Sequence, residues 1–67
     1  MEICVNDIAV ETQEGTRLSE VLAGKGILNS AGLAVALNNR VIKKNNWQET
    51  ILKNQDKVLI IRAAQGG

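Results

Sequence analysis

The amino-terminal segment alternates between hydrophobic and less hydrophobic residues. Over residues 1–6 the odd positions hold Met, Ile and Val, and the even positions hold Glu, Cys and Asn. This two-residue period is typical of a half-buried β-strand. Asn6 and Asp7 favour a two-residue turn, because both residue types tolerate positive φ. Ile8 and Val10 follow with the same period, so the first eleven residues predict a β-hairpin.

The next pattern has the period of a helix. Leu18, Val21 and Leu22 are spaced i, i+3, i+4, which places them on one helical face. We therefore expect a helix over residues 17–24, with Thr16 as the N-cap whose hydroxyl accepts a hydrogen bond from a first-turn amide. A helix this short does not persist alone in water, so it must pack on a sheet.

The second half of the chain predicts a second hairpin and a final strand. Residues 33–37 alternate large and small hydrophobic side chains, Asn38 and Asn39 favour a turn, and residues 40–42 form a short partner strand. Residues 57–61 begin with Lys and continue with four aliphatic residues. This last strand is apolar on both of its faces.

Between the second hairpin and the last strand, the sequence predicts a polar loop over residues 43–46. The single aromatic residue, Trp47, follows this loop. We expect Trp47 to fold over an edge of the core, with Ile51 and Leu52 filling a gap beside it.

This order of elements predicts an α+β fold. A four- to five-stranded mixed sheet with one main helix packed on one face is the compact arrangement, because the chain is too short to cover both faces of a parallel sheet. If the first and last strands are parallel neighbours, the arrangement is a β-grasp. We expect residues 1–62 to form this single domain and residues 63–67 to form a flexible tail ending in Gly-Gly.

Composition narrows the function classes. The chain has 67 residues, of which 45% are hydrophobic, which supports one compact core rather than a disordered segment. With 8 basic against 7 acidic residues and one aromatic, nucleic-acid binding has little support. No apolar run approaches the roughly 20 residues of a membrane span, and residues 1–6 lack signal-peptide features. A cytoplasmic location is expected.

The sequence predicts no active site of its own. The chain has no histidine and a single cysteine, Cys4, which excludes histidine chemistry, an intrachain disulfide and a cysteine metal cluster. Cys4 is interpreted as a small apolar side chain on a strand. The carboxylates are scattered without the spacing of a catalytic pair or a metal site. We therefore expect no catalytic residue, no metal and no bound cofactor, and the protein is not expected to be an enzyme.

The carboxyl-terminal segment offers a different kind of chemistry. Residues 62–67 read Arg-Ala-Ala-Gln-Gly-Gly, so nothing bulky follows Arg62 and the tail could enter a narrow tunnel. The carboxylate of Gly67 is unhindered. Coupling to AMP would make Gly67 electrophilic, and a sulfur nucleophile could then convert it to a thiocarboxylate. The alternative is a tail that frays and has no role.

The chain resembles the ThiS family of sulfur carriers, within the ubiquitin-like β-grasp superfamily. The residues that carry this resemblance are residues 1–7, residues 33–42, Trp47, residues 58–61, and the closing Gly66 and Gly67. The resemblance spans essentially the whole chain.

The resemblance implies a reaction cycle carried out by partner enzymes. A ThiF-type adenylating enzyme would use ATP and magnesium to adenylate Gly67, and sulfur from a persulfide donor would replace AMP. A ThiG-type thiazole synthase would then take the sulfur from the Gly67 thiocarboxylate to form the thiazole of thiamine. Gln65, Gly66 and Gly67 would enter the partner's active site.

Partner docking is expected on the face of the sheet opposite the helix. If Val58 and Ile60 point to the core, Leu59 and Ile61 point outward beside Ala36 and form a small apolar patch. Arg62 would lie at the edge of this patch and steer an acidic partner. The alternative is that Leu59 and Ile61 cover part of the core under Trp47, because sequence does not fix which face each residue occupies.

Other functions remain open from the sequence. A molybdopterin-type sulfur carrier would share the fold and tail chemistry but serve another acceptor. A ubiquitin-like modifier would join Gly67 to a lysine, and a non-covalent β-grasp interaction module would have no use for the tail. We expect the isolated protein to be a monomer.

Overall fold

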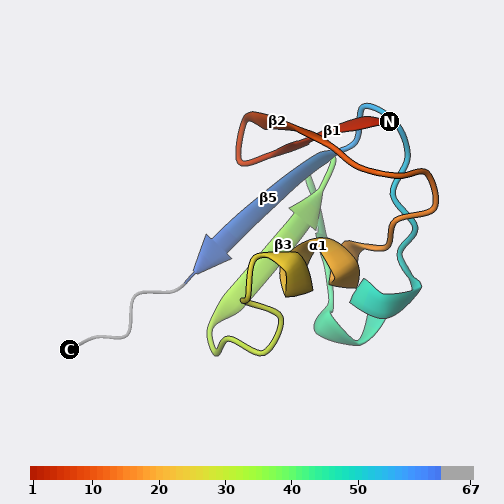
Figure 1. Cartoon of the computed structure of the whole chain (residues 1–67). Helices are drawn as coiled ribbons and strands as arrows, with labels where there is room; N and C mark the ends of the chain where they lie inside the picture. The colour runs from red at the N-terminus through yellow and green to blue at the C-terminus, as the bar shows by residue number, and fades with distance from the viewer. Residues whose placement is uncertain (63–67) are drawn as a thin grey trace.

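Five strands form one mixed sheet in the computed structural model, which describes residues 1–62. The elements are β1 (Glu2–Val5), β2 (Ile8–Glu11), helix α1 (Leu18–Gly24), β3 (Leu33–Leu37), β4 (Arg40–Ile42), the 3-10 helix η1 (Lys44–Glu49) and β5 (Lys57–Arg62). The strand order is β2-β1-β5-β3-β4. Strands β1 and β5 are parallel, the other neighbouring pairs are antiparallel, and α1 lies across one face (Figure 1). The predicted α+β, β-grasp arrangement is confirmed.

Both predicted hairpin turns have the left-handed backbone that they require. The φ angles are 50° at Asn6 and 68° at Asp7, and 51° at Asn38 and 70° at Asn39. Two consecutive residues with positive φ make a turn whose twist matches that of the flanking strands. Asn and Asp adopt this conformation at lower cost than most residues, so the turn chemistry fixes the β1–β2 and β3–β4 pairings.

The core lies between the sheet and the two helices. Its buried residues, all hydrophobic, are Ile3, Val5, Leu18, Leu22, Val35, Trp47, Leu52 and Val58. The Trp47 side chain is only 3% exposed, and its indole Nε1 donates a hydrogen bond to the Ile42 carbonyl at 2.8 Å. This bond satisfies the one polar atom of the ring, which allows the largest side chain of the protein to be buried.

The start of α1 differs from the prediction. Arg17, not Thr16, is the N-cap, and the Glu20 carboxylate accepts a hydrogen bond from the Arg17 amide at 2.9 Å. The Thr16 hydroxyl instead donates to the Gln13 carbonyl at 2.6 Å, and the Thr16 carbonyl accepts from the Leu52 amide at 2.8 Å. Thr16 is therefore committed to the preceding turn and to residue 52, and the helix begins one residue later than predicted.

The segment before β5 also differs from the prediction. The expected polar loop at residues 43–46 mostly belongs to η1. Leu52 is buried as expected, but Ile51 is 53% exposed, so the expectation that both fill a gap in the core is wrong for Ile51. An isolated β-bridge between Arg17 and Ile51 sets the backbone here, and adjacent residues in extended backbone point in opposite directions.

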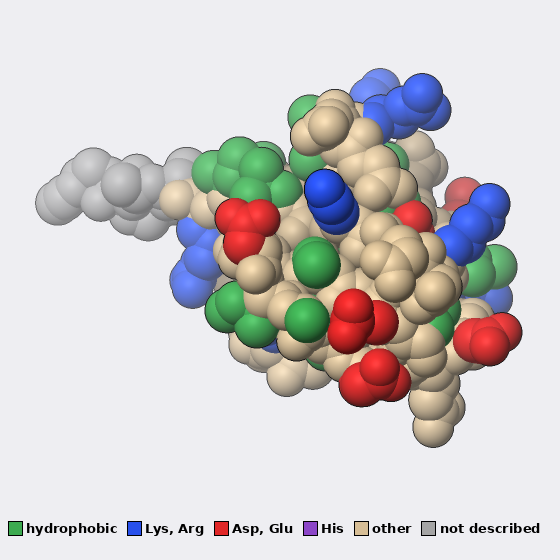
Figure 2. Space-filling model, turned by 90° about the horizontal axis from the view of Figure 1, so that it is seen from above, with side chains coloured by type: hydrophobic (Ala, Val, Ile, Leu, Met, Phe, Trp, Pro, Cys, Tyr) green, Lys and Arg blue, Asp and Glu red, His purple; other side chains and the backbone are tan. Residues whose placement is uncertain are grey.

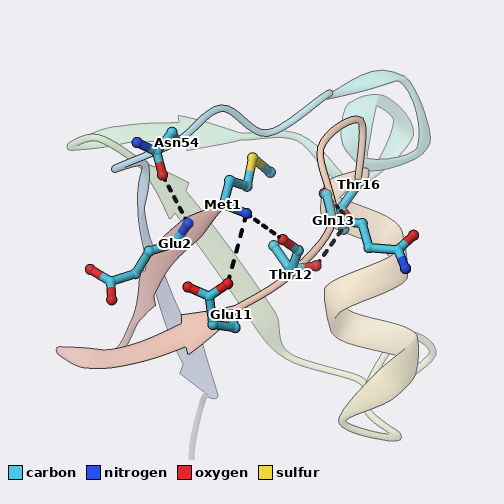
Figure 3. A network of polar contacts seen from close by, with 7 residues as sticks. All are labelled: Met1, Glu2, Glu11, Thr12, Gln13, Thr16 and Asn54. Atoms are coloured by element: carbon cyan, nitrogen blue, oxygen red, sulfur yellow. Dashed lines mark hydrogen bonds and ion pairs between the residues drawn. The ribbon is translucent and has the colours of Figure 1, made fainter.

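A network of polar contacts holds the beginning of β1 (Figure 3). The Met1 amine donates to the Thr12 carbonyl at 2.8 Å and lies 3.8 Å from a carboxylate oxygen of Glu11. The Glu2 amide donates to the Asn54 side-chain oxygen at 2.8 Å. These contacts tie β1 both to the segment after β2 and to the loop that precedes β5.

Candidate functional site: the outer face of the sheet and strand β5

Strand β5 alternates between the core and the opposite face of the sheet. Val58 is buried, Ile60 is half-buried, and Leu59 and Ile61 are 48% and 54% exposed. The predicted alternation is confirmed, and the alternative that Leu59 and Ile61 cover the core under Trp47 is wrong. Both side chains lie on the face that α1 leaves open.

Neighbouring strands complete an apolar surface around these two side chains. Ala36 pairs with Leu59 and, on its other side, with Val41, which is 73% exposed. A hollow of about 510 Å³ on this face includes Cys4, Ala36, Val41, Leu59 and Ile61 among its lining residues. We call these five residues the outer apolar face. The small Ala36 side chain leaves Leu59 accessible to a partner surface.

Val41 is a member of this face that was not predicted from the sequence. The signal was present, because a two-residue turn at Asn38 and Asn39 pairs Ala36 with Val41 by count alone. Cys4 likewise joins the outer apolar face because Ile3 and Val5 point into the core. Figure 2 shows hydrophobic side chains gathered at the end of the molecule where the described chain stops.

Arg62 does not lie with this group. It has the same parity along β5 as Val58 and Ile60 and pairs with Leu33. It lines a separate groove on the helix side of the sheet, together with Ile60 and Lys25. The structure thus brings together Ala36, Leu59 and Ile61 as expected, but places Arg62 on the opposite face.

The asparagine at position 6 holds β5 with its side chain. Its Oδ1 accepts a hydrogen bond from the Ile60 amide at 2.7 Å, and its Nδ2 donates to the Ile60 carbonyl at 3.3 Å. The Asn6 amide also donates to the Val58 carbonyl at 2.9 Å. The side chain thus continues the ladder beyond the end of β1, which supports β5 at the level of the outer apolar face.

Asn38 holds the beginning of β5 by hydrogen bonds from its side chain and its backbone. Its Oδ1 accepts from the Lys57 amide at 2.9 Å, its amide donates to the Lys57 carbonyl at 2.8 Å, and its Nδ2 donates to the Asp56 carboxylate at 3.0 Å. From the sequence alone, Asn6 and Asn38 are predicted only as turn residues. Their second role depends on β5, which lies far away in sequence.

The predicted reacting residues lie outside the described part of the chain. Gln65, Gly66 and Gly67 follow residue 62, so their role in a partner's active site stays a prediction. Within residues 1–62, no three or more His, Cys, Asp or Glu side chains are grouped so as to hold a metal ion. No helix in that part of the chain is long and apolar enough to cross a membrane. The candidate site is therefore the outer apolar face together with β5, which leads to the tail.

Comparison with known proteins identifies the family. The model of the ThiS family matches residues 2–67. The sulfur carrier protein ThiS of Escherichia coli (strain K12) is 28% identical over 67 residues, which cover all of both chains.

Two solved structures have the same fold. The crystal structure of the thiamine biosynthesis protein ThiS from Geobacter metallireducens has a TM-score of 0.83 at 23% identity and covers all of both chains. The solution structure of a thiamine biosynthesis protein from the same organism has a TM-score of 0.79 at 25% identity, over 100% of this chain and 88% of that one. Because the family model matches nearly every residue and the β-grasp fold agrees, the chain belongs to the ThiS family.

Proposed function

We propose that the protein is a sulfur carrier for thiamine biosynthesis and that partner enzymes act on it. The observation that carries this proposal is the family match, which runs through the closing Gly66 and Gly67. The alignment with the Escherichia coli carrier covers the full length of both chains, which supports the same role for this carboxyl end. A cytoplasmic location stays a prediction.

The proposed chemistry takes place at the carboxylate of Gly67. One carboxylate oxygen attacks the α-phosphorus of ATP, pyrophosphate leaves, and the product is an acyl adenylate. Magnesium bound with ATP in the ThiF-type enzyme would neutralise the phosphate charge. The terminal sulfur of a persulfide donor then attacks the Gly67 carbonyl carbon, AMP leaves, and an acyl disulfide joins Gly67 to the donor. A thiol attacks the donor sulfur of this S–S bond and forms a disulfide with the donor, and Gly67 is released as a thiocarboxylate that a ThiG-type synthase can use for the thiazole ring. When sulfide itself is supplied, it attacks the acyl adenylate directly and gives the same thiocarboxylate.

In this proposal the folded domain supplies recognition. Leu59, Ile61 and Val41 are large apolar side chains that remain about half exposed or more, and burying them against a partner is favourable. Leu59 and Ile61 lie on the strand that leads to the tail, and Val41 lies two strands away, across β3. A partner docked on the outer apolar face would hold β5 while its active site receives Gly67.

The direct test is the intact mass of the protein after incubation with a ThiF-type enzyme, ATP, magnesium and a sulfide source. We expect a gain equal to the mass of sulfur minus oxygen, located on Gly67 by fragmentation. The matched control is the chain without Gly66 and Gly67, which should gain nothing. An unchanged mass, with the same enzyme active on its own carrier, would contradict the proposal and favour a non-covalent module. A stable conjugate with a lysine would favour a protein modifier.

A further inference from the structure

A second groove opens on the helix side of the sheet, near the end of β5. Ile8, Lys25, Ile27, Ile60 and Arg62 contribute to its lining, and its volume is about 430 Å³. We call these five residues the helix-side groove. It lies across the sheet from the outer apolar face, because Ile60 and Arg62 alternate with Leu59 and Ile61 along β5.

The apolar part of the helix-side groove includes an unusually exposed side chain. Ile8 is 67% exposed although it pairs with the buried Val5 and therefore lies on the same side of the sheet as the core. Ile27 and Ile60 are half-buried at the rim of that core. An apolar side chain from another protein could cover Ile8 without any rearrangement of the core.

The charged side chains that line the groove are both cationic. Lys25 and Arg62 both line it, and none of its lining residues is acidic. Among residues 1–62, the ion pair in the structure joins the Met1 amine to Glu11. Neither Lys25 nor Arg62 takes part in it. Two cations around an apolar floor complement a segment that carries carboxylates and an apolar side chain.

The position of the groove connects it with the proposed reaction. Arg62 is the last described residue, and five residues separate it from the end of Gly67. Five residues span at most about 18 Å when fully extended. An enzyme that holds Gly67 in its active site must therefore place some of its surface within reach of Arg62 and the groove.

We propose that the helix-side groove binds an acidic segment of the enzyme that adenylates Gly67. Carboxylates of this segment pair with Lys25 and Arg62, and an apolar side chain of the segment covers Ile8. The inference rests on the proposed function and extends it, since the enzyme then holds β5 from both faces of the sheet. The outer apolar face supplies apolar contact, and the helix-side groove supplies charge selection.

The test compares charge reversal in the groove with the same charge change elsewhere. The groove variant carries Lys25→Glu and Arg62→Glu, and the control variant carries Lys43→Glu and Lys53→Glu, two exposed lysines outside the groove. Calorimetry gives the Kd of each chain for a ThiF-type enzyme without ATP, at low and high salt. We expect the groove variant to bind about tenfold or more weakly and the control within about twofold. The salt dependence should be smaller for the groove variant than for the unmodified protein.

A second variant keeps the test independent of net charge and folding. Ile8→Ser removes the exposed apolar side chain, leaves the charge unchanged, and should also weaken binding. Circular dichroism and urea midpoints would show that every variant is folded. Equal weakening in the groove and control variants would overturn the proposal, because net charge alone would then explain it.

Two other occupants would also be detected. Weakened binding to a ThiG-type synthase with unchanged binding to the adenylating enzyme would overturn the proposal in favour of the synthase. A dimer that the groove variant abolishes, seen by sedimentation, would overturn it in favour of a second copy of the chain. Thiocarboxylate formation on the unmodified protein tests the proposed function separately. Failure of the groove proposal can therefore be distinguished from failure of the proposed function.

Discussion

At the scale of single residues, Asn6 and Asn38 each perform two tasks. Each begins a two-residue turn with positive φ, and each uses its side-chain amide to pair with the backbone of β5. A glycine would satisfy the first task and not the second. The choice of asparagine therefore joins the geometry of two local hairpins to β5, the strand that precedes the carboxyl-terminal residues.

The contribution of the Asn6 side chain can be isolated with Asn6→Gly. Glycine retains the positive φ, but both hydrogen bonds to Ile60 are lost, so we expect a loss of about 1–2 kcal/mol in the free energy of unfolding. The control is Asn39→Gly, since Asn39 also has positive φ but forms no side-chain hydrogen bond within residues 1–62; its effect should stay below about 0.5 kcal/mol. Urea denaturation measures both. Equal effects would contradict a role for the side-chain amide.

Leu59 and Ile61 permit a test of the outer apolar face. Leu59→Glu and Ile61→Glu should each weaken binding to the adenylating enzyme about tenfold or more. Because both side chains are about half exposed, each change should cost less than about 1 kcal/mol of stability. Ile51→Glu is the matched control, since Ile51 is similarly exposed and lies away from this face. Unfolding of the Leu59 and Ile61 variants, or weakened binding of the control, would contradict the assignment.

At the scale of elements, η1 and Trp47 close the end of the core that α1 leaves uncovered. The indole ring is buried, and its hydrogen bond to the Ile42 carbonyl connects η1 to the end of β4. The Arg17 side chain donates to the Gln48 carbonyl at 2.9 Å, which connects α1 to η1. This short 3-10 helix thus joins the helix to the second hairpin.

Trp47→Phe tests the importance of this connection. The smaller ring leaves a cavity and leaves the Ile42 carbonyl without the indole donor, so we expect a loss of about 1–3 kcal/mol in the free energy of unfolding. Ile51→Ala, four residues away and exposed, should cost clearly less. Circular dichroism in urea measures both. Equal costs would show that η1 is not a structural part of the core.

The elements that could be predicted from sequence are those specified by local chemistry. The alternating hydrophobic residues of the strands and the two-residue turns at residues 6–7 and 38–39 predict both hairpins. Both signals depend only on residues that are close together in the sequence. The start of α1 could not be predicted, because the Thr16 carbonyl pairs with Leu52. The exposure of Ile51 also depends on a bridge to Arg17. Such contacts join distant segments and leave no local pattern.

At the scale of the whole molecule, the candidate site also combines features that local sequence predicts with features that depend on contacts between distant segments. The sequence left two facings of Leu59 and Ile61 open, and the burial of Val58 places both side chains on the outer apolar face. Arg62 was placed on the wrong face, although the alternation that exposes Ile61 carries the next residue to the helix side. The helix-side groove depends on Ile8, Lys25 and Arg62 meeting in space, which only the folded chain reveals.

The parallel pairing of β1 and β5 also has a mechanical consequence. The described chain begins beside β1 and ends with β5 (Figure 1), so a force that pulls its two ends apart slides these strands along each other. Several hydrogen bonds between the two strands then share the load instead of breaking one after another. They are the bonds that the Cys4 and Asn6 backbone amides donate to the Asp56 and Val58 carbonyls, and the two bonds between the Asn6 side chain and the Ile60 backbone. In the proposed reaction, an enzyme that pulls on Gly67 would therefore act against a strand that resists being drawn out of the sheet.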